Sequence, residues 1–169
     1  MMFDFWNFYK GLLQRTDYFD DYWDTFPKGR HMRFKSETLA LLEKVINTRN
    51  SEELASVLSI IYNDGADRDF TRLLLRLLKE NWHKSEEDVV GILELIKDPL
   101  SVGKLYEVAI NIPDYDDMRA LAKKCMWALS SIETPEAIEK LKLLKEFDDP
   151  IIRENASFHL DTVANKPQL

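Results

Sequence analysis

Helical hairpins recur along most of this chain at a nearly constant spacing, and no other feature constrains the fold as strongly. From residue 36 onward the apolar side chains follow the i, i+3, i+4, i+7 pattern of amphipathic helices, and no stretch alternates as a strand does. First helices of the hairpins begin near 36, 68, 100 and 134, and second helices near 51, 85, 116 and 149. A repeat of 31–34 residues predicts an all-α fold, an α-solenoid of about four hairpins that bury their apolar faces against one another.

The ends of the predicted helices carry capping chemistry. Thr134 and Asp149 each precede a proline, which places an N-cap residue before a proline at the first helical position. The Ser-Glu-Glu start at 51 returns at 85, an offset of 34, and Arg119 aligns with Arg153 at the same offset.

We expect one structural domain. Its hairpins cover 36–63, 68–97, 100–132 and 134–165, and residues 1–35 form aromatic-rich capping helices and a basic connector.

The last hairpin carries a motif that narrows the fold class. Residues 130–160 read SSIETPEAIEKLKLLKEFDDPIIRENASFHL. This stretch resembles a HEAT repeat of the short bacterial kind, with a Thr-Pro-Glu-Ala helix start at Thr134, an Asp-containing turn at 148–149, and the Ile152-Arg153 pair followed by Ala156. The motif covers about 115–165, whereas 36–114 resembles the family in architecture only. Tetratricopeptide repeats have a similar length, but their Trp, Gly and Tyr signature is absent.

The charge balance limits the class of partner. Thirty acidic residues stand against 23 basic ones, a net charge of −7. Proteins that bind nucleic acid need a clustered basic surface, so we expect no nucleic-acid partner and instead a basic protein. The single cysteine excludes an intrachain disulfide and fits a reducing compartment. Because the N-terminus lacks a basic signal region and no run approaches 18 apolar residues, we expect a cytoplasmic protein without membrane contact.

The residues that usually carry chemistry are scattered. The three histidines, His31, His83 and His159, form no metal-binding pair, and no phosphate loop, dinucleotide fingerprint or nucleophile elbow occurs. His159 and Cys125 fall on core-facing positions of their helices. The sequence therefore predicts no catalytic residues, no metal and no cofactor, which directs attention to the surface.

Positions that face outward on the second helices are mostly acidic. They are Glu52 on the first of these helices, Glu87 and Glu94 on the second, Asp116, Lys123 and Trp127 on the third, and Glu154 and Asp161 on the fourth. In proteins similar to HEAT repeats the second helices line the concave surface, so this resemblance implies a negative groove that contains one aromatic residue. For any single helix, a solvated charged face is the better explanation, and it is the agreement across four helices that favours a basic protein partner.

Trp127 is the most informative of these positions. The helix predicted over 117–132 centres its core face elsewhere, on Met118, Ala122, Cys125, Met126 and Leu129. Trp127 points roughly opposite to that centre and aligns with Asp161 of the last repeat. It is either an exposed binding residue or a ring that packs on a neighbouring helix.

The N-terminal 26 residues hold ten of the 19 aromatic residues. Phe5, Phe8, Tyr9, Leu12 and Leu13 make one helical stripe, and Tyr18, Phe19, Tyr22, Trp23 and Phe26 make a second. The second stripe leaves Asp20, Asp21 and Asp24 on its other side. This region can cap the open end of a solenoid, contact the partner through its aspartates, or lie on a membrane. Acidic polar faces disfavour the last.

These observations predict a binding module and not an enzyme. The main hypothesis is an immunity or inhibitor protein that neutralises a basic toxin domain through an acidic concave surface. The alternatives are a general adaptor or scaffold protein and, from another class, an enzyme similar to HEAT-like DNA glycosylases or bilin lyases. The glycosylase type requires a basic concave face, and here the sequence predicts an acidic one.

Overall fold

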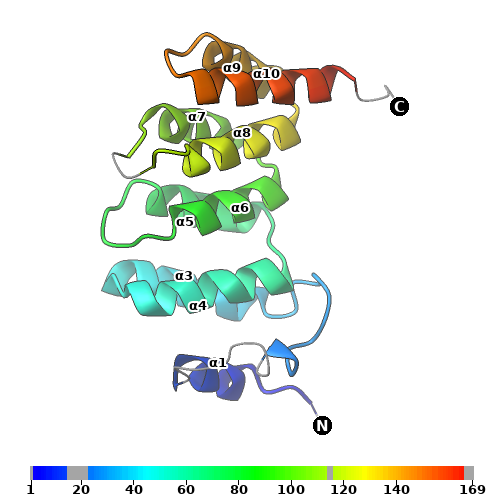
Figure 1. The fold of residues 1–169 in the computed structure, drawn as a ribbon. Coiled ribbons are helices and arrows are strands. Elements are labelled where there is room, and N and C mark those ends of the chain that lie inside the picture. The colour runs from blue at the N-terminus through cyan, green and yellow to red at the C-terminus, as the bar shows by residue number, and fades with distance from the viewer. Residues whose placement is uncertain (1, 15–22, 114–115, 166–169) are drawn as a thin grey trace. The chain divides into compact units, whose positions relative to one another are not determined.

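The computed structural model describes residues 2–14, 23–113 and 116–165, and every regular element in these ranges is helical (Figure 1). This confirms the all-α prediction. The chain divides into two compact units. Unit 1 comprises Met1–Asp67 and Asn81–Ser85, and unit 2 comprises Arg68–Glu80 and Glu86–Leu169.

The helices begin close to the predicted starts. Unit 1 contains α1 (Phe5–Gln14), α3 (Lys35–Thr48) and α4 (Ser51–Asp64). Unit 2 contains a 3₁₀ turn at Arg68–Phe70, α5 (Thr71–Leu77), α6 (Glu86–Ile96), a second 3₁₀ turn at Pro99–Ser101, α7 (Val102–Ile110), α8 (Ala120–Ile132), α9 (Pro135–Lys145) and α10 (Pro150–Ala164).

Side-chain caps fix several of these starts. The Thr134 hydroxyl accepts a hydrogen bond from the backbone N–H of Ala137, and the Asp149 carboxylate accepts from Ile151 and Ile152. In unit 1 the Asn50 side chain accepts from the N–H of Glu53. Each cap satisfies backbone donors that the first helical turn leaves without an internal partner.

The core of unit 1 is rich in aromatic rings. Phe8 and Phe26 have ring centroids 5.1 Å apart, and Phe5 stacks on Phe34 at 4.9 Å. Four residues of the first predicted stripe are buried, whereas Leu13 keeps 41% of its surface exposed. Residues 18–22 of the second stripe lie outside the described residues. Its remaining members, Trp23 and Phe26, are half-buried and buried.

Helix α1 is joined to α4 by a polar contact as well as by packing. The Tyr9 hydroxyl donates a hydrogen bond to Glu53 Oε2 at 2.9 Å. Burial and the neighbouring carboxylate raise the pKa of the Tyr9 phenol well above its usual value, so the group stays protonated and remains a donor.

The start of α3 is capped from the far end of its own hairpin. Phe34 stands at the N-cap position and makes no side-chain cap. Instead Asp64, which ends α4 and is 1% exposed, accepts hydrogen bonds from the N–H groups of Arg33 and Phe34 at 3.0 and 2.8 Å. Gly65 follows with a φ of 103°, a conformation that favours glycine. The Asn-Asp-Gly stretch thus ends α4, and its aspartate also caps the start of α3, the preceding helix.

In unit 2 the second helices of successive hairpins pack side by side. Helix α6 contacts α8, and α8 contacts α10 (Figure 1). Helix α7 packs against α8 and α9, and α9 packs against α10. The interior is mostly aliphatic, with Leu93, Leu105 and Leu129 fully buried, and Phe70 is a buried aromatic residue within it. The consecutive contacts bring the outward positions of α6, α8 and α10 onto one surface.

The prediction that Met118 lies in the core is wrong. Met118 is 67% exposed, because α8 begins only at Ala120 and the residue before it, Arg119, has a left-handed φ of 57°. The turn therefore releases Met118 from the helical register. The other predicted core positions of this helix, Ala122, Cys125, Met126 and Leu129, are buried.

Candidate functional site

The candidate site is a surface of unit 2 that we call the α6–α8–α10 face. Glu87 and Glu94 come from α6, Lys123 and Trp127 from α8, and Glu154, Phe158 and Asp161 from α10. Six of these seven were predicted as outward positions, and none of the seven is fully buried. Because the three helices contact one another in sequence, these side chains share a single surface.

Three acids on this face have unpaired carboxylates. Glu154 and Asp161 are exposed and Glu94 is half-buried. Within the described part of the chain, none of the three takes part in a hydrogen bond or an ion pair through its carboxylate. An unpaired carboxylate keeps its charge available to a partner.

Glu87 is the acid of this face that has a partner. Its Oε2 lies 3.0 Å from Nζ of Lys124, across the α6–α8 contact. Both side chains are about half exposed, so the pair contributes little to stability. It does reduce the negative charge that Glu87 offers to a partner protein.

Asp116 corrects the predicted surface. It is 8% exposed, and its carboxylate accepts hydrogen bonds from the N–H groups of Ala120 and Leu121 at 2.7 and 3.2 Å. The residue is buried because it caps the start of α8, and it cannot serve as a binding residue without uncapping that helix. The periodicity alone could not separate a capping aspartate from a surface one.

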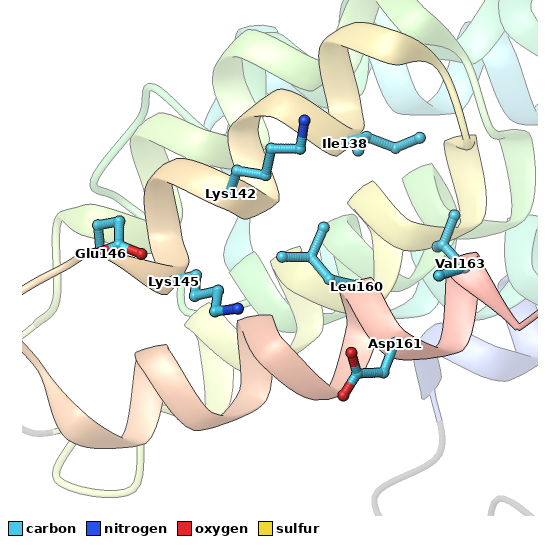
Figure 2. A pocket seen from close by; sticks show the side chains of 8 residues that line it. Ile138, Lys142, Lys145, Glu146, Leu160, Asp161 and Val163 are labelled. Atoms are coloured by element: carbon cyan, nitrogen blue, oxygen red, sulfur yellow. The ribbon is translucent and has the colours of Figure 1, made fainter.

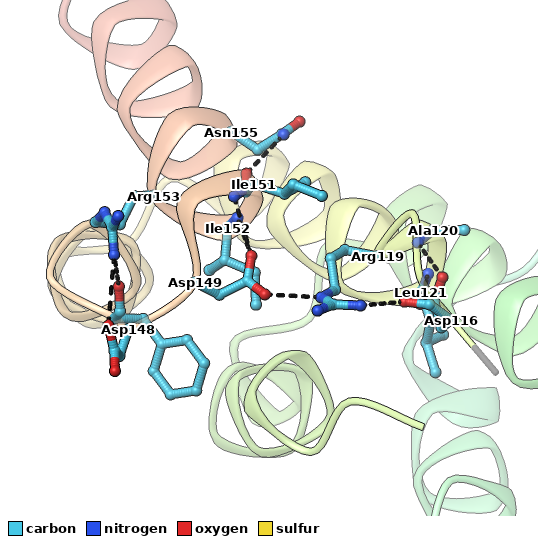
Figure 3. Close-up of polar contacts among 11 residues, drawn as sticks. Asp116, Arg119, Ala120, Leu121, Asp148, Asp149, Ile151, Ile152, Arg153 and Asn155 are labelled. Carbon is cyan, nitrogen blue, oxygen red and sulfur yellow. Dashed lines mark hydrogen bonds and ion pairs between the residues drawn. The ribbon is translucent and has the colours of Figure 1, made fainter. Parts of the chain in front are cut away.

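Asp116 belongs to a network that joins two hairpins (Figure 3). Nη1 of Arg119 donates to the Asp116 carbonyl oxygen at 2.6 Å, and Nε of Arg119 donates to Oδ2 of Asp149 at 2.8 Å. Asp149 in turn caps α10. Although burial by itself raises the pKa of Asp149, hydrogen bonds from the Ile152 N–H and the Arg119 guanidinium hold it below its usual value.

The two aligned arginines do not have the same contacts. Arg119 bridges to the next hairpin, whereas Arg153 donates to the Phe147 carbonyl oxygen within its own hairpin at 2.9 Å. Arg153 also lies inside α10, while Arg119 precedes α8. The two arginines align in sequence at an offset of 34, but the structure gives them different partners.

Trp127 is half exposed and also packs on a neighbouring helix, so each earlier interpretation describes part of its environment. It keeps 50% of its surface accessible. Its ring lies edge-on to Phe158 and His159 of α10, at centroid distances of 6.5 and 4.8 Å. Phe158 is 57% exposed. Trp127 and Phe158 thus form an exposed aromatic pair, which we call the α8–α10 pair.

Sequence reasoning missed Phe158. At about 100° per residue, Glu154, Phe158 and Asp161 fall within roughly a 60° arc of α10. Phe158 therefore stood on the predicted acidic stripe. The repeat alignment matches Trp127 with Asp161, so it does not indicate Phe158. Only the packing of α8 on α10 brings Phe158 next to Trp127.

His159 lies at the base of the α8–α10 pair. It is 1% exposed, which confirms its predicted core position, and it touches both rings. Its Nδ1 has no hydrogen-bond partner among the described residues. Burial lowers the pKa of the imidazole, so the ring is neutral at pH 7.

The remaining predicted site residues belong to unit 1. Glu52 is exposed on α4, and Asp24 is exposed and paired with Lys28, whose Nζ lies 3.2 Å from Oδ1. Asp20 and Asp21 lie outside the described residues.

A groove runs between α9 and α10 (Figure 2). Its volume is about 630 Å³, and Ile138, Leu160 and Val163 line it together with Lys142 and Lys145. Asp161 lies on its edge. The groove shares Asp161 with the α6–α8–α10 face. Its two lysines balance the two acids of its lining, Glu146 and Asp161, so it offers a cation no excess of negative charge.

The described residues offer little for catalysis. No group of three or more His, Cys, Asp or Glu side chains among them could hold a metal ion. Cys125 is buried as predicted, and burial raises the pKa of its thiol well above the usual range, so it is not a reactive thiolate. Of the helices that the structure describes, none is both long and apolar enough to cross a membrane.

Comparisons with known proteins give no identity. No family model, curated protein or solved structure matches this chain.

Proposed function

We propose that this chain is a non-enzymatic, HEAT-like α-solenoid of about four hairpins that binds a basic protein through its α6–α8–α10 face. The partner is a toxin domain, and the chain acts in the cytoplasm as its immunity protein. The observation that carries this proposal is the group of unpaired carboxylates of Glu94, Glu154 and Asp161 around an exposed aromatic pair. Exposed aromatic side chains are frequent binding hot spots, and surrounding charges select the partner and speed its association.

The chemistry of the face favours a protein partner over nucleic acid. Its unpaired carboxylates would repel a phosphate backbone, which binding proteins neutralise with lysine and arginine. The immunity role is the more specific part of the proposal, and it draws on the likeness of the last hairpin to HEAT-like inhibitors. A fold-level likeness of this kind is an analogy.

The test begins with capture of the partner by the tagged full chain in its native cells, followed by titration of the purified partner. We expect a basic protein whose affinity falls with added salt and falls by about ten-fold or more in the E154K/D161K variant. E43K/E136K is the matched control, because Glu43 and Glu136 are exposed acids on α3 and α9. It should change the affinity by less than about two-fold.

Two outcomes would count against parts of the proposal. An affinity that survives E154K/D161K overturns the acidic face as the binding site. A captured partner that stays fully active when saturated with this chain supports binding but contradicts the immunity role, and favours an adaptor. Binding to duplex DNA at physiological salt would overturn the charge argument.

A further inference from the structure

We propose that the α8–α10 pair binds an arginine side chain of the partner, with Trp127 and Phe158 contacting the guanidinium plane and Glu154 and Asp161 supplying its counter-charge. This inference rests on the proposed function and names the group that the face recognises. It concerns one site of about four side chains rather than the whole acidic surface.

The aromatic half of the site is accessible to a ligand. Trp127 and Phe158 keep 50% and 57% of their surfaces accessible, although they stand on adjacent helices and contact each other. The rings meet at an interplanar angle of 63°, so they form two inclined walls and not a closed stack. A flat cation fits against such walls because ring faces attract positive charge.

The acidic half of the site flanks Phe158. Glu154 precedes it by one turn, and Asp161 follows it by one turn on the same arc of α10. Both carboxylates lack a hydrogen-bond or ion-pair partner within the residues that the structure describes. A guanidinium has five N–H donors in a fixed plane and can use two carboxylates while it stacks on a ring. An ammonium cannot do both equally well.

His159 provides a further observation that points to a ligand. Its imidazole is 1% exposed, touches both rings of the pair, and leaves Nδ1 without a partner among the described residues. In neutral histidine one ring nitrogen accepts a hydrogen bond. Among the described residues, an unpartnered ring nitrogen thus lies next to the pair, and the neutral imidazole adds no positive charge that would compete with a bound guanidinium.

The positive charge of Lys123 repels a bound cation, so reversing this charge tests the sign of the charge on the ligand. Lys123 lies one turn before Trp127 on α8 and is half-buried, and its ammonium has no ion-pair partner among the described residues. If an arginine binds at the α8–α10 pair, Lys123→Glu should strengthen the binding. A neutral or anionic occupant would not require this direction, and the lysine and citrulline compounds below separate a guanidinium from other groups.

The experiment uses N-acetyl-arginine methylamide as the probe at constant ionic strength. Two analogues serve as comparisons, the neutral citrulline compound and the lysine compound. ¹H–¹⁵N spectra of the full chain report the indole N–H of Trp127, assigned with W127F, and the backbone amide of Phe158. We expect both resonances to shift saturably with the arginine compound, several-fold more weakly with lysine and not saturably with citrulline.

Variants define the contribution of each half of the site. E154Q/D161N and F158A should each weaken the arginine compound by about three- to ten-fold, while K123E should strengthen it by about two-fold. E43Q/E136Q is the control for the charge variants and should leave the affinity unchanged. Equal shifts with arginine and citrulline, or a weaker complex in K123E, would overturn the proposal.

The partner protein separates this inference from the proposed function. If E154K/D161K abolishes partner binding but W127A and F158A do not, the acidic face stands and the arginine site is wrong. If none of these variants affects the partner, both proposals fail. Thermal unfolding followed by circular dichroism identifies any variant that no longer folds, and W127F then replaces W127A.

Discussion

Units 1 and 2 are both helical, but different interactions hold their helices in place. In unit 1, aromatic rings pack around α1, and the buried carboxylate of Asp64 caps the start of α3 within its own hairpin. In unit 2 the interior is mostly aliphatic, and the Asp116–Arg119–Asp149 network runs from one hairpin to the next. Helical hairpins with similar sequence spacing are therefore stabilised by local packing in unit 1 and by a charged link between hairpins in unit 2.

The largest expected effect comes from removing a ring from unit 1. Phe26 is 4% exposed and packs against both Phe8 and Phe34. Phe26→Ala should lower the free energy of unfolding by about 3–5 kcal/mol, because it removes buried apolar surface and leaves a cavity. Hydrogen exchange should increase first in unit 1. Leu13→Ala, at a 41% exposed position of α1, is the control and should change stability by less than about 0.5 kcal/mol.

The charged link of unit 2 comes next. Arg119→Ala leaves the largely buried carboxylate of Asp149 without its cation and should cost about 3 kcal/mol at pH 7. Exchange should increase in α8 and α10 rather than in unit 1. Arg153→Ala is the matched control, because Arg153 is exposed and bonds only within its own hairpin, and its cost should stay below about 1 kcal/mol.

The same variant predicts a pH dependence. The folded pKa of Asp149 is lowered, so its stabilisation is complete above the unfolded value of about 3.9 and is lost as the pH falls through the folded value. The stability difference between the wild-type chain and Arg119→Ala should therefore be constant from pH 7 to about 5 and shrink at lower pH. Urea titrations across this range measure it. A difference that grows on acidification would contradict the link.

Asp64 tests whether the local cap of unit 1 is weaker than the link of unit 2. Asp64→Ala removes the acceptor of two backbone N–H groups at the start of α3 and should cost about 2 kcal/mol. Asp64→Asn keeps one acceptor oxygen and should cost about half as much. Chemical denaturation of the three proteins gives the order. An Asp64→Ala cost above that of Arg119→Ala would reverse the comparison.

The smallest expected effect is at the contact between α1 and α4. Tyr9→Phe removes one hydrogen bond to Glu53, which retains contacts with Asn50 and Lys44, and should cost about 1 kcal/mol at pH 7. The folded pKa of Tyr9 is raised, so its stabilisation is present below about pH 10 and is lost as the pH rises further. The difference between wild type and Tyr9→Phe should therefore shrink above pH 10.

The all-α class, the starts of most helices and most of the core follow from the sequence alone, but the start of α8 does not. Apolar spacing reports which side of a helix is buried, and the Thr-Pro and Asp-Pro pairs mark helix starts, so both are local properties. The outward positions of α10 and α6 followed from the same spacing. Glu154, Asp161 and Glu87 are exposed as predicted.

Which of those outward residues can act together depends on the tertiary structure. Asp116 is buried and accepts hydrogen bonds from the first turn of α8, and Met118 lies in a turn. Phe158 stands beside Trp127 although 31 residues separate them in the chain. Each depends on a backbone conformation or on packing between hairpins. A helical period records the direction of a side chain around its own axis, but not the neighbour that another helix brings to it.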